Sequence, residues 1–253
     1  MQRIEQPSVQ SLLLQMRYGD TLLGTATGFV VHTAHGPALV TNRHVVTGRD
    51  QATGEPLSKT AGIPDNLAIW HNRHNALGQW VSKREPLYDD GQPRWREHPT
   101  LGAKADLALL PLTDDAECQL YPYDPSSPGP DILVVPSDPV SVVGFPFGMS
   151  GGGLFAIWAT GFLATEPVAD FGDLPVVLVD CRGRQGQSGS PVVAYRSGGS
   201  ATLANGSMVM GTGAMWKFIG VYSGRVNSES DLGIVWKASA VAELVKSVER
   251  SRR

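Results

Sequence analysis

The chain has 253 residues, a formal net charge of −3 and a pI near 6.1, and 42% of its residues are hydrophobic. This length suffices for one or two domains with sizeable cores. The slightly acidic charge argues against a nucleic-acid-binding surface, and no run reaches the roughly 18 apolar residues of a membrane-spanning helix. We therefore expect neither nucleic acid nor a membrane as a partner.

The first half of the chain contains short β-branched and apolar runs separated by turn residues, the pattern of an all-β barrel or sandwich. The candidate strands span residues 24–32, 37–46, 67–71, 79–87 and 106–112. Residues 47–65 and 89–104 are polar and contain glycine or proline, so we expect loops there. The density of proline in residues 124–130 predicts an extended connector.

The second half repeats the strand pattern and ends differently. Its candidate strands span residues 139–145, 154–165, 175–182, 190–196, 218–226 and 233–238. Two glycine-containing segments, residues 147–153 and 197–217, are predicted loops that either border a cleft or simply connect surface strands. Ala238–Arg250 carries apolar residues at helical spacing, which predicts a terminal α-helix.

The cysteine content and the N-terminal segment bear on the cellular compartment. Only two cysteines occur, Cys118 and Cys181, and this number fits a reducing compartment better than a secreted, disulfide-rich protein. Residues 1–7 lack the basic start and the long apolar run of a signal peptide. We therefore expect a cytoplasmic location.

The most informative stretch is Gly186–Pro191, which reads Gly-Gln-Ser-Gly-Ser-Pro. A serine hydroxyl is a weak nucleophile that needs a base to take its proton and donors to hold the oxyanion that forms. Glycines beside Ser188 allow backbone N–H groups to turn toward the hydroxyl. The turn is therefore a candidate nucleophile and oxyanion hole, although glycine, serine and proline also make ordinary turns.

A base and a carboxylate precede this turn. His44 ends the apolar run of residues 39–46, and Asp106 opens the run of residues 106–112. Taken alone, His44 is more readily interpreted as a core histidine, and Asp106 as an aspartate that bonds local N–H groups. Together, the order His, Asp, Ser favours a catalytic triad of His44, Asp106 and Ser188.

Four segments in this order resemble the chymotrypsin-fold, or trypsin-like, serine peptidases, in particular their bacterial HtrA-like and glutamyl-endopeptidase branches. They are residues 41–46 (TNRHVV), 106–110 (DLALL), 143–148 (VGFPFG) and 180–191 (DCRGRQGQSGSP). The resemblance implies two antiparallel six-stranded β-barrels with the active-site cleft between them and a C-terminal α-helix. We do not expect the PDZ domain of the HtrA-like proteins, because too few residues remain for it.

On this basis we divide the chain into two barrels. Residues 1–118 form the first barrel with His44 and Asp106, residues 119–136 a linker, residues 137–237 the second barrel with Ser188, and residues 238–253 the helix and tail.

The resemblance also implies a role for each site residue. His44 is the general base, Asp106 orients it, Ser188 is the nucleophile, and the N–H groups of Gly186 and Ser188 hold the oxyanion. No metal or organic cofactor is expected, the substrate is a protein or peptide, and a regulatory protein partner is an open possibility. Zymogen-activated members carry an aspartate where this chain has Gln187. Glutamine has no charge to pair with a new N-terminus, so activity is predicted without N-terminal cleavage.

The substrate pocket is predicted from the same resemblance. Arg182 occupies its base, and Ser223, Gly224 and Arg225 form a wall. Guanidinium groups there favour an acidic side chain before the cleaved bond. The alternative is that the arginines face solvent or pair with nearby acidic residues, and a small-to-medium apolar side chain is preferred.

Two other functions are compatible with the motifs. One is a catalytically silent scaffold or binding module on the same fold. The other is a narrow-specificity esterase or processing enzyme.

Overall fold

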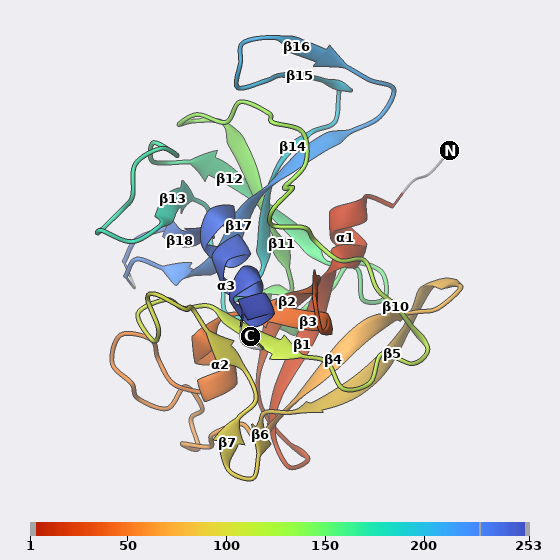
Figure 1. The fold of residues 1–253 in the computed structure, drawn as a ribbon, viewed down its shortest axis with the longest axis vertical. Helices are drawn as coiled ribbons and strands as arrows, with labels where there is room; N and C mark the ends of the chain where they lie inside the picture. The colour runs from red at the N-terminus through yellow and green to blue at the C-terminus, as the bar shows by residue number, and fades with distance from the viewer. Residues whose placement is uncertain (1–3, 228, 251–253) are drawn as a thin grey trace.

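The computed structural model describes residues 4–227 and 229–250, which form two antiparallel β-sheet systems (Figure 1). The first sheet follows a five-residue helix, α1 (Gln6–Gln10). Its eight strands are β1 (Ser11–Tyr18), β2 (Thr21–Thr33), β3 (Gly36–Thr41), β4 (Asn66–Arg73), β5 (Ala76–Pro86), β8 (Arg96–Glu97), β9 (Ala108–Pro111) and β10 (Cys118–Gln119). A separate two-stranded sheet joins β6 (Tyr88–Asp89) to β7 (Gln92–Pro93).

The first sheet differs from the predicted six-stranded closed barrel. Its strand order is β10-β4-β1-β2-β3-β9-β8, with β5 paired to β4, and among the described residues the end strands β10 and β8 do not pair with each other. The two-residue strands β8 and β10 at its ends are too short to extend the pairing. The sheet is therefore an open eight-stranded system that still holds the segments of His44 and Asp106.

The second sheet is the closed six-stranded barrel that the sequence predicts. Its order is β11-β12-β13-β18-β17-β14. The strands are β11 (Pro139–Gly144), β12 (Ile157–Leu163), β13 (Val176–Asp180), β14 (Pro191–Arg196), β17 (Met215–Arg225) and β18 (Leu232–Lys237). A 3₁₀ turn, η1 (Pro146–Gly148), follows β11.

Several short elements were not predicted, and neither were three features of more consequence: β1, α2 and a hairpin in the second half of the chain. β1 reads SLLLQMRY and is buried on both faces, so it shows neither the alternation nor the β-branched content by which strands are recognised. A helical turn, α2 (Arg43–Thr47), replaces the second half of the strand predicted over residues 37–46. The predicted loop at residues 197–217 contains a hairpin of β15 (Ser200–Thr202) and β16 (Met208–Met210).

A shared core joins the two sheets. Phe29 of β2 lies edge-on to Tyr123 of the connector and to Phe218 of β17, with ring centroids 5.0 and 5.5 Å apart. The predicted helix is α3 (Ala238–Arg250; Figure 1). Its Val241 and Leu244 side chains are buried in the same core. Contacts from both sheets therefore hold the cleft-forming segments in a fixed relation.

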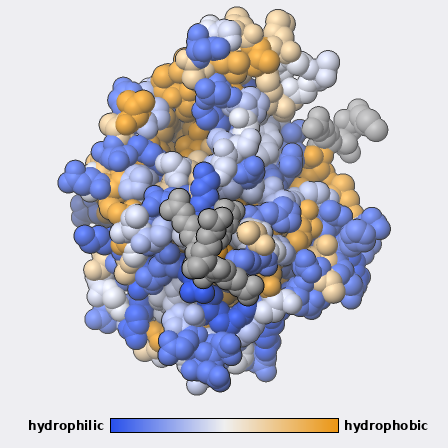
Figure 2. All heavy atoms as spheres, in the orientation of Figure 1, coloured by the Kyte–Doolittle hydropathy of each residue, from blue (hydrophilic) through white to orange (hydrophobic). Residues whose placement is uncertain are grey.

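Cys118 and Cys181 are free thiols. The surface is mixed, with apolar side chains gathered toward the second barrel on the face shown in Figure 2. Among the helices of residues 4–227 and 229–250, none combines the length and hydrophobicity of a membrane-spanning segment.

Candidate active site

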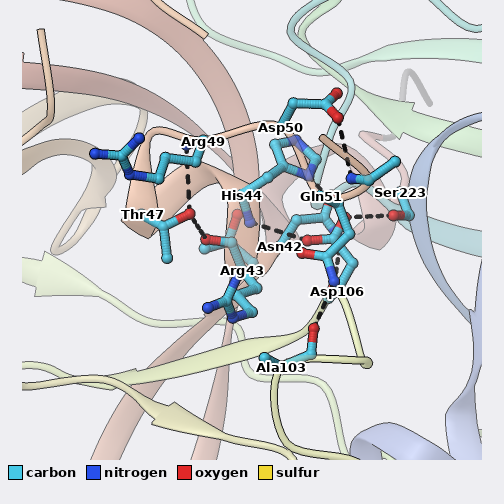
Figure 3. Close-up of polar contacts among 12 residues, drawn as sticks. Asn42, Arg43, His44, Thr47, Arg49, Asp50, Gln51, Ala103, Asp106 and Ser223 are labelled. Atoms are coloured by element: carbon cyan, nitrogen blue, oxygen red, sulfur yellow. Dashed lines mark hydrogen bonds and ion pairs between the residues drawn. The ribbon is translucent and has the colours of Figure 1, made fainter. Parts of the chain in front are cut away.

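His44 and Asp106 are held against one another at the end of the first sheet (Figure 3). The Nδ1 atom of His44 lies 2.6 Å from Oδ2 of Asp106, and the backbone N–H of His44 donates to Oδ1 at 2.9 Å. Asn42, in the extended position before α2, donates from its side chain to the carbonyl oxygen of Asp106 at 2.7 Å. The helical turn therefore presents both its backbone and its imidazole to one buried carboxylate.

Ser223 provides a third contact to this carboxylate from the second barrel. Its hydroxyl donates to Oδ2 of Asp106, the oxygen that also contacts His44 (Figure 3). The sequence placed Ser223 in the wall of a substrate pocket. Its side chain is directed to Asp106, so β17 contributes to the positioning of the imidazole, and the place of Ser223 in the pocket wall stays a prediction.

Asp106 is ionised at neutral pH. Burial raises the pKa of its carboxyl, but the charge of His44 and the hydrogen bonds from His44 and Ser223 outweigh this and hold the pKa below its ordinary value of 3.8. An ionised carboxylate only accepts hydrogen bonds, so Nδ1 of His44 must carry its proton. In the neutral imidazole, Nε2 is then the basic nitrogen.

The same lowered pKa makes a prediction for stability. A carboxyl with a depressed folded-state pKa stabilises the fold above its unfolded value, and this contribution is lost as the pH falls through the folded-state pKa. Asp106→Asn should therefore lower the free energy of unfolding at neutral pH. Below pH 3.8, the free energy of unfolding of the variant should fall less steeply with decreasing pH than that of the wild type. Urea unfolding at a series of pH values measures this. An unchanged acid limb in the variant would contradict it.

The turn around Ser188 is clamped to strand β2. Thr27 donates its N–H to the carbonyl oxygen of Ser188 at 2.9 Å and its hydroxyl to that of Gly186 at 2.8 Å. Gly186 and Gly189 have φ values of +94° and +84°. A Cβ on Gly189 would lie 2.1 Å from the carbonyl oxygen of Thr27, so only glycine fits there.

Most N–H groups of this turn are already used. The N–H of Arg184 donates to Oε1 of Gln187, and the N–H of Gln187 donates to the carbonyl oxygen of Arg184. The N–H of Gly189 donates to the carbonyl oxygen of Tyr222, and the N–H of Ser190 to that of Gln187. In the described part of the chain, the N–H groups of Gly186 and Ser188 have no acceptor. They are the two predicted oxyanion donors.

The peptide before Gly186 is oriented by the segment after β11. The carbonyl oxygen of Gln185 accepts the N–H of Phe147 at 2.6 Å. Because C=O and N–H point in opposite directions across a trans peptide, the N–H of Gly186 points away from Phe147. The predicted loop at residues 147–153 therefore does border the site, and it helps to set one candidate donor.

His44 and Ser188 meet in one cavity of about 210 Å³, which Gly186 also lines. His44 comes from the first sheet, and Ser188 from the turn that leads into β14 of the second barrel. No side-chain hydrogen bond joins His44 to Ser188 among the described residues. The cavity nonetheless places the candidate base and the candidate nucleophile at one substrate position.

Tyr222 packs between the segments of the predicted substrate pocket. Arg182 and Arg225 are both exposed. Between their segments, the Tyr222 ring fills the space left by two glycines: a Cβ on Gly183 would lie 1.6 Å from the Tyr222 hydroxyl, and one on Gly233 would lie 2.4 Å from the ring. The role of Arg182, Gly224 and Arg225 in substrate binding stays a prediction, and the phenol leaves less room for a large side chain between those segments.

Comparisons with known proteins identify the family of the chain. Residues 26–199 match the family model of the trypsin-like peptidase domain. The chain belongs to the trypsin-like peptidase family, and it is a serine protease. A search of the curated proteins gave no match.

Two solved structures with this fold come from bacteria. An inactive serine-to-alanine mutant of Rv3671c from M. tuberculosis H37Rv is 17% identical, with a TM-score of 0.53 over 98% of this chain and 89% of that one. A serine endoprotease from Yersinia pestis is 13% identical, with a TM-score of 0.55 over 98% of this chain and 67% of that one. At these identities the likeness shows the chymotrypsin-like fold.

Proposed function

We propose that this trypsin-like peptidase is an endopeptidase that hydrolyses peptide bonds through a His44–Asp106–Ser188 triad and an acyl-enzyme on Ser188. The observation that carries the proposal is the cavity in which His44, already bonded to Asp106, meets Ser188 and Gly186. The proposal keeps the division of the chain into two halves with the cleft between them, a linker at residues 119–136 and a terminal helix, with the open first sheet in place of the first barrel.

The mechanism follows from these contacts. Nε2 of His44 takes the proton of the Ser188 hydroxyl as the oxygen attacks the substrate carbonyl, and Asp106 stabilises the imidazolium. The oxyanion is held by the N–H groups of Gly186 and Ser188, which have no other acceptor in the described structure. The imidazolium then protonates the departing amine, and water releases the acyl group by the reverse sequence.

The alternative of a catalytically silent scaffold requires that His44, Asp106 and Ser188 take part in no reaction. It is disfavoured because the candidate nucleophile, base and carboxylate are all present and two backbone donors are left unpaired. A narrow-specificity esterase would share the same acyl-enzyme. Peptide hydrolysis distinguishes it from the peptidase.

A small activated ester tests the proposal directly. p-Nitrophenyl acetate should give a burst of p-nitrophenol stoichiometric with enzyme, since acylation of Ser188 precedes slower hydrolysis. Ser188→Ala should give no burst. A wild-type protein that hydrolyses peptides without forming an acyl-enzyme would contradict the mechanism.

Ser223 is expected to act as a positioning residue. Ser223→Ala removes one hydrogen bond to the charged Asp106 carboxylate. Because one such bond contributes roughly the free energy of a tenfold rate change, we expect kcat to fall about tenfold with KM little changed. Ser223→Thr retains a hydroxyl and should recover most of the rate. Equal loss in both variants would show that Ser223 acts through packing alone.

Activity should not depend on N-terminal cleavage. Gln187 is fully buried, and its side-chain oxygen accepts the N–H of Arg184 at 2.7 Å, so the turn is closed by a local hydrogen bond. No charge is present at this position to pair with an ammonium group. Protein with an intact N-terminus, verified by mass spectrometry, should be active. Activity that appears only after N-terminal cleavage would refute this.

A further inference from the structure

Trp80 joins the first sheet to the loop that borders the Ser188 turn. It lies in β5, the second strand of the β4–β5 hairpin, and pairs with Asn72 of β4. Its ring lies edge-on to Phe155, with the ring centroids 5.2 Å apart and the ring planes at 78°. A Cβ on Gly153 would lie 2.5 Å from the same indole, so the loop backbone lies directly against it. A hairpin of the first sheet therefore packs on the segment that follows η1.

The loop that Trp80 contacts is rich in glycine. Residues 147–153 read FGMSGGG, and three of these glycines have left-handed φ values between +60° and +78°. Glycine loses more backbone freedom on folding than any other residue. Within the loop, the N–H of Gly151 donates to the carbonyl oxygen of Phe155 at 2.9 Å, and the Ser150 hydroxyl donates to that of Gly153. These bonds close the turn, and packing from outside fixes its place against the site.

The start of this loop orients a candidate oxyanion donor. Phe147 donates its N–H to the carbonyl oxygen of Gln185, which turns the N–H of Gly186 the opposite way. Phe147 does so from a left-handed conformation, with φ at +56°. A residue with a Cβ stays in that conformation only where surrounding contacts hold it there. The Phe147 side chain is 59% exposed, so the hold comes mainly from the loop backbone and from what packs against it.

We propose that Trp80 is a positioning residue for the oxyanion hole. The inference rests on the proposed acyl-enzyme mechanism. The indole holds the loop of residues 147–155, and the loop keeps the N–H of Phe147 on the carbonyl oxygen of Gln185. That bond keeps the N–H of Gly186 directed to the substrate carbonyl oxygen. Trp80 does not line the cavity beside the nucleophile, so its effect on the reaction passes through the loop.

Loss of the indole frees the peptide between Gln185 and Gly186 to rotate. A rotated peptide presents a carbonyl oxygen in place of an N–H donor and removes one of the two candidate donors. The oxyanion develops in the transition state and is absent from the bound substrate. Loss of its donor therefore lowers kcat and leaves KM nearly unchanged.

Substitution of Trp80 tests this expectation. Trp80→Ala should lower kcat for a peptide substrate about tenfold to a hundredfold, approaching the loss of one oxyanion donor, with KM within about twofold. Trp80→Phe keeps a ring against the loop and should recover most of the rate. Leu77→Ala is the control on the same hairpin, since Leu77 is 62% exposed, and it should keep the wild-type kcat. The imidazole proton resonances of His44 should be the same in all these variants, because its contact with Asp106 is not altered.

Two neighbouring glycines test the contact from the side of the loop. Gly153 and Gly152 have similar φ values of +78° and +60°, so alanine meets similar backbone strain at both positions. A Cβ on Gly153 meets the Trp80 ring, whereas nothing lies within 4 Å of one on Gly152. Gly153→Ala should therefore lower kcat at least fivefold more than Gly152→Ala. Trp80→Ala combined with Gly153→Ala should cost little more than either change alone, because both disturb the same contact.

The outcomes that would overturn the inference are specific. They are wild-type kcat in folded Trp80→Ala, an equal loss in Leu77→Ala, equal losses in the two glycine variants, or losses that multiply in the double variant. The glycine pair decides the question by itself where Trp80→Ala does not fold. Absence of a p-nitrophenol burst from folded wild-type protein would instead contradict the acyl-enzyme mechanism on which the inference rests.

Discussion

Ser188→Ala should reduce kcat for peptide hydrolysis by on the order of a million-fold while the fold is retained, because the covalent step is lost. The turn is held by backbone contacts and by Thr27, not by the Ser188 hydroxyl. Steady-state hydrolysis of a peptide substrate and the circular dichroism spectrum measure the two parts. His44→Ala should lose activity to a similar extent.

The matched control lies two residues away. The Ser190 hydroxyl is fully buried and has no hydrogen-bond partner in the described structure. Ser190→Ala removes the same atom type from the same turn and should retain most of the activity. Near-normal turnover by Ser188→Ala would contradict the triad, and comparable loss in both variants would indicate disruption of the turn rather than removal of the nucleophile.

Asp106→Asn should reduce kcat by about 10⁴-fold, the size expected when the neutral amide no longer holds His44 in the productive tautomer. The amide has a nitrogen donor where the carboxylate accepts from His44 and Ser223, so the imidazole loses its fixed orientation. The pH dependence of kcat and the imidazole proton resonances report this change directly.

Asp114→Asn is the corresponding control. Asp114 is a surface carboxylate whose pKa is also lowered, chiefly by a hydrogen bond from Lys83. It does not line the cavity that His44 and Ser188 share. Its neutralisation should leave kcat unchanged. Full activity of Asp106→Asn would remove the carboxylate from the mechanism.

Local patterns were sufficient to predict most of the second barrel and the terminal helix. Each barrel strand is an apolar, β-branched run bounded by turns, and α3 shows helical spacing of apolar residues. β1 was missed because its leucines are buried on both faces and show no alternation. The β15–β16 hairpin was missed because three-residue strands in a glycine-rich stretch carry almost no periodicity.

Some residues of the candidate site could likewise be predicted from local patterns, and others could not. His44, Asp106 and Ser188 could be proposed from sequence because each lies in a distinctive local segment. The contact of Ser223 with Asp106, the hold of Thr27 on the Ser188 turn and the filling of space by Tyr222 depend on residues distant in sequence. No local signal encodes them, since they arise only when the two sheets pack together.

Labelling with a serine-reactive fluorophosphonate tests the central claim most directly. The wild-type protein should be modified once, with the adduct located by peptide mass spectrometry at Ser188, and Asp106→Asn should react far more slowly. Ser188→Ala should not be labelled. An adduct at another serine, or no adduct on correctly folded wild-type protein, would contradict the account.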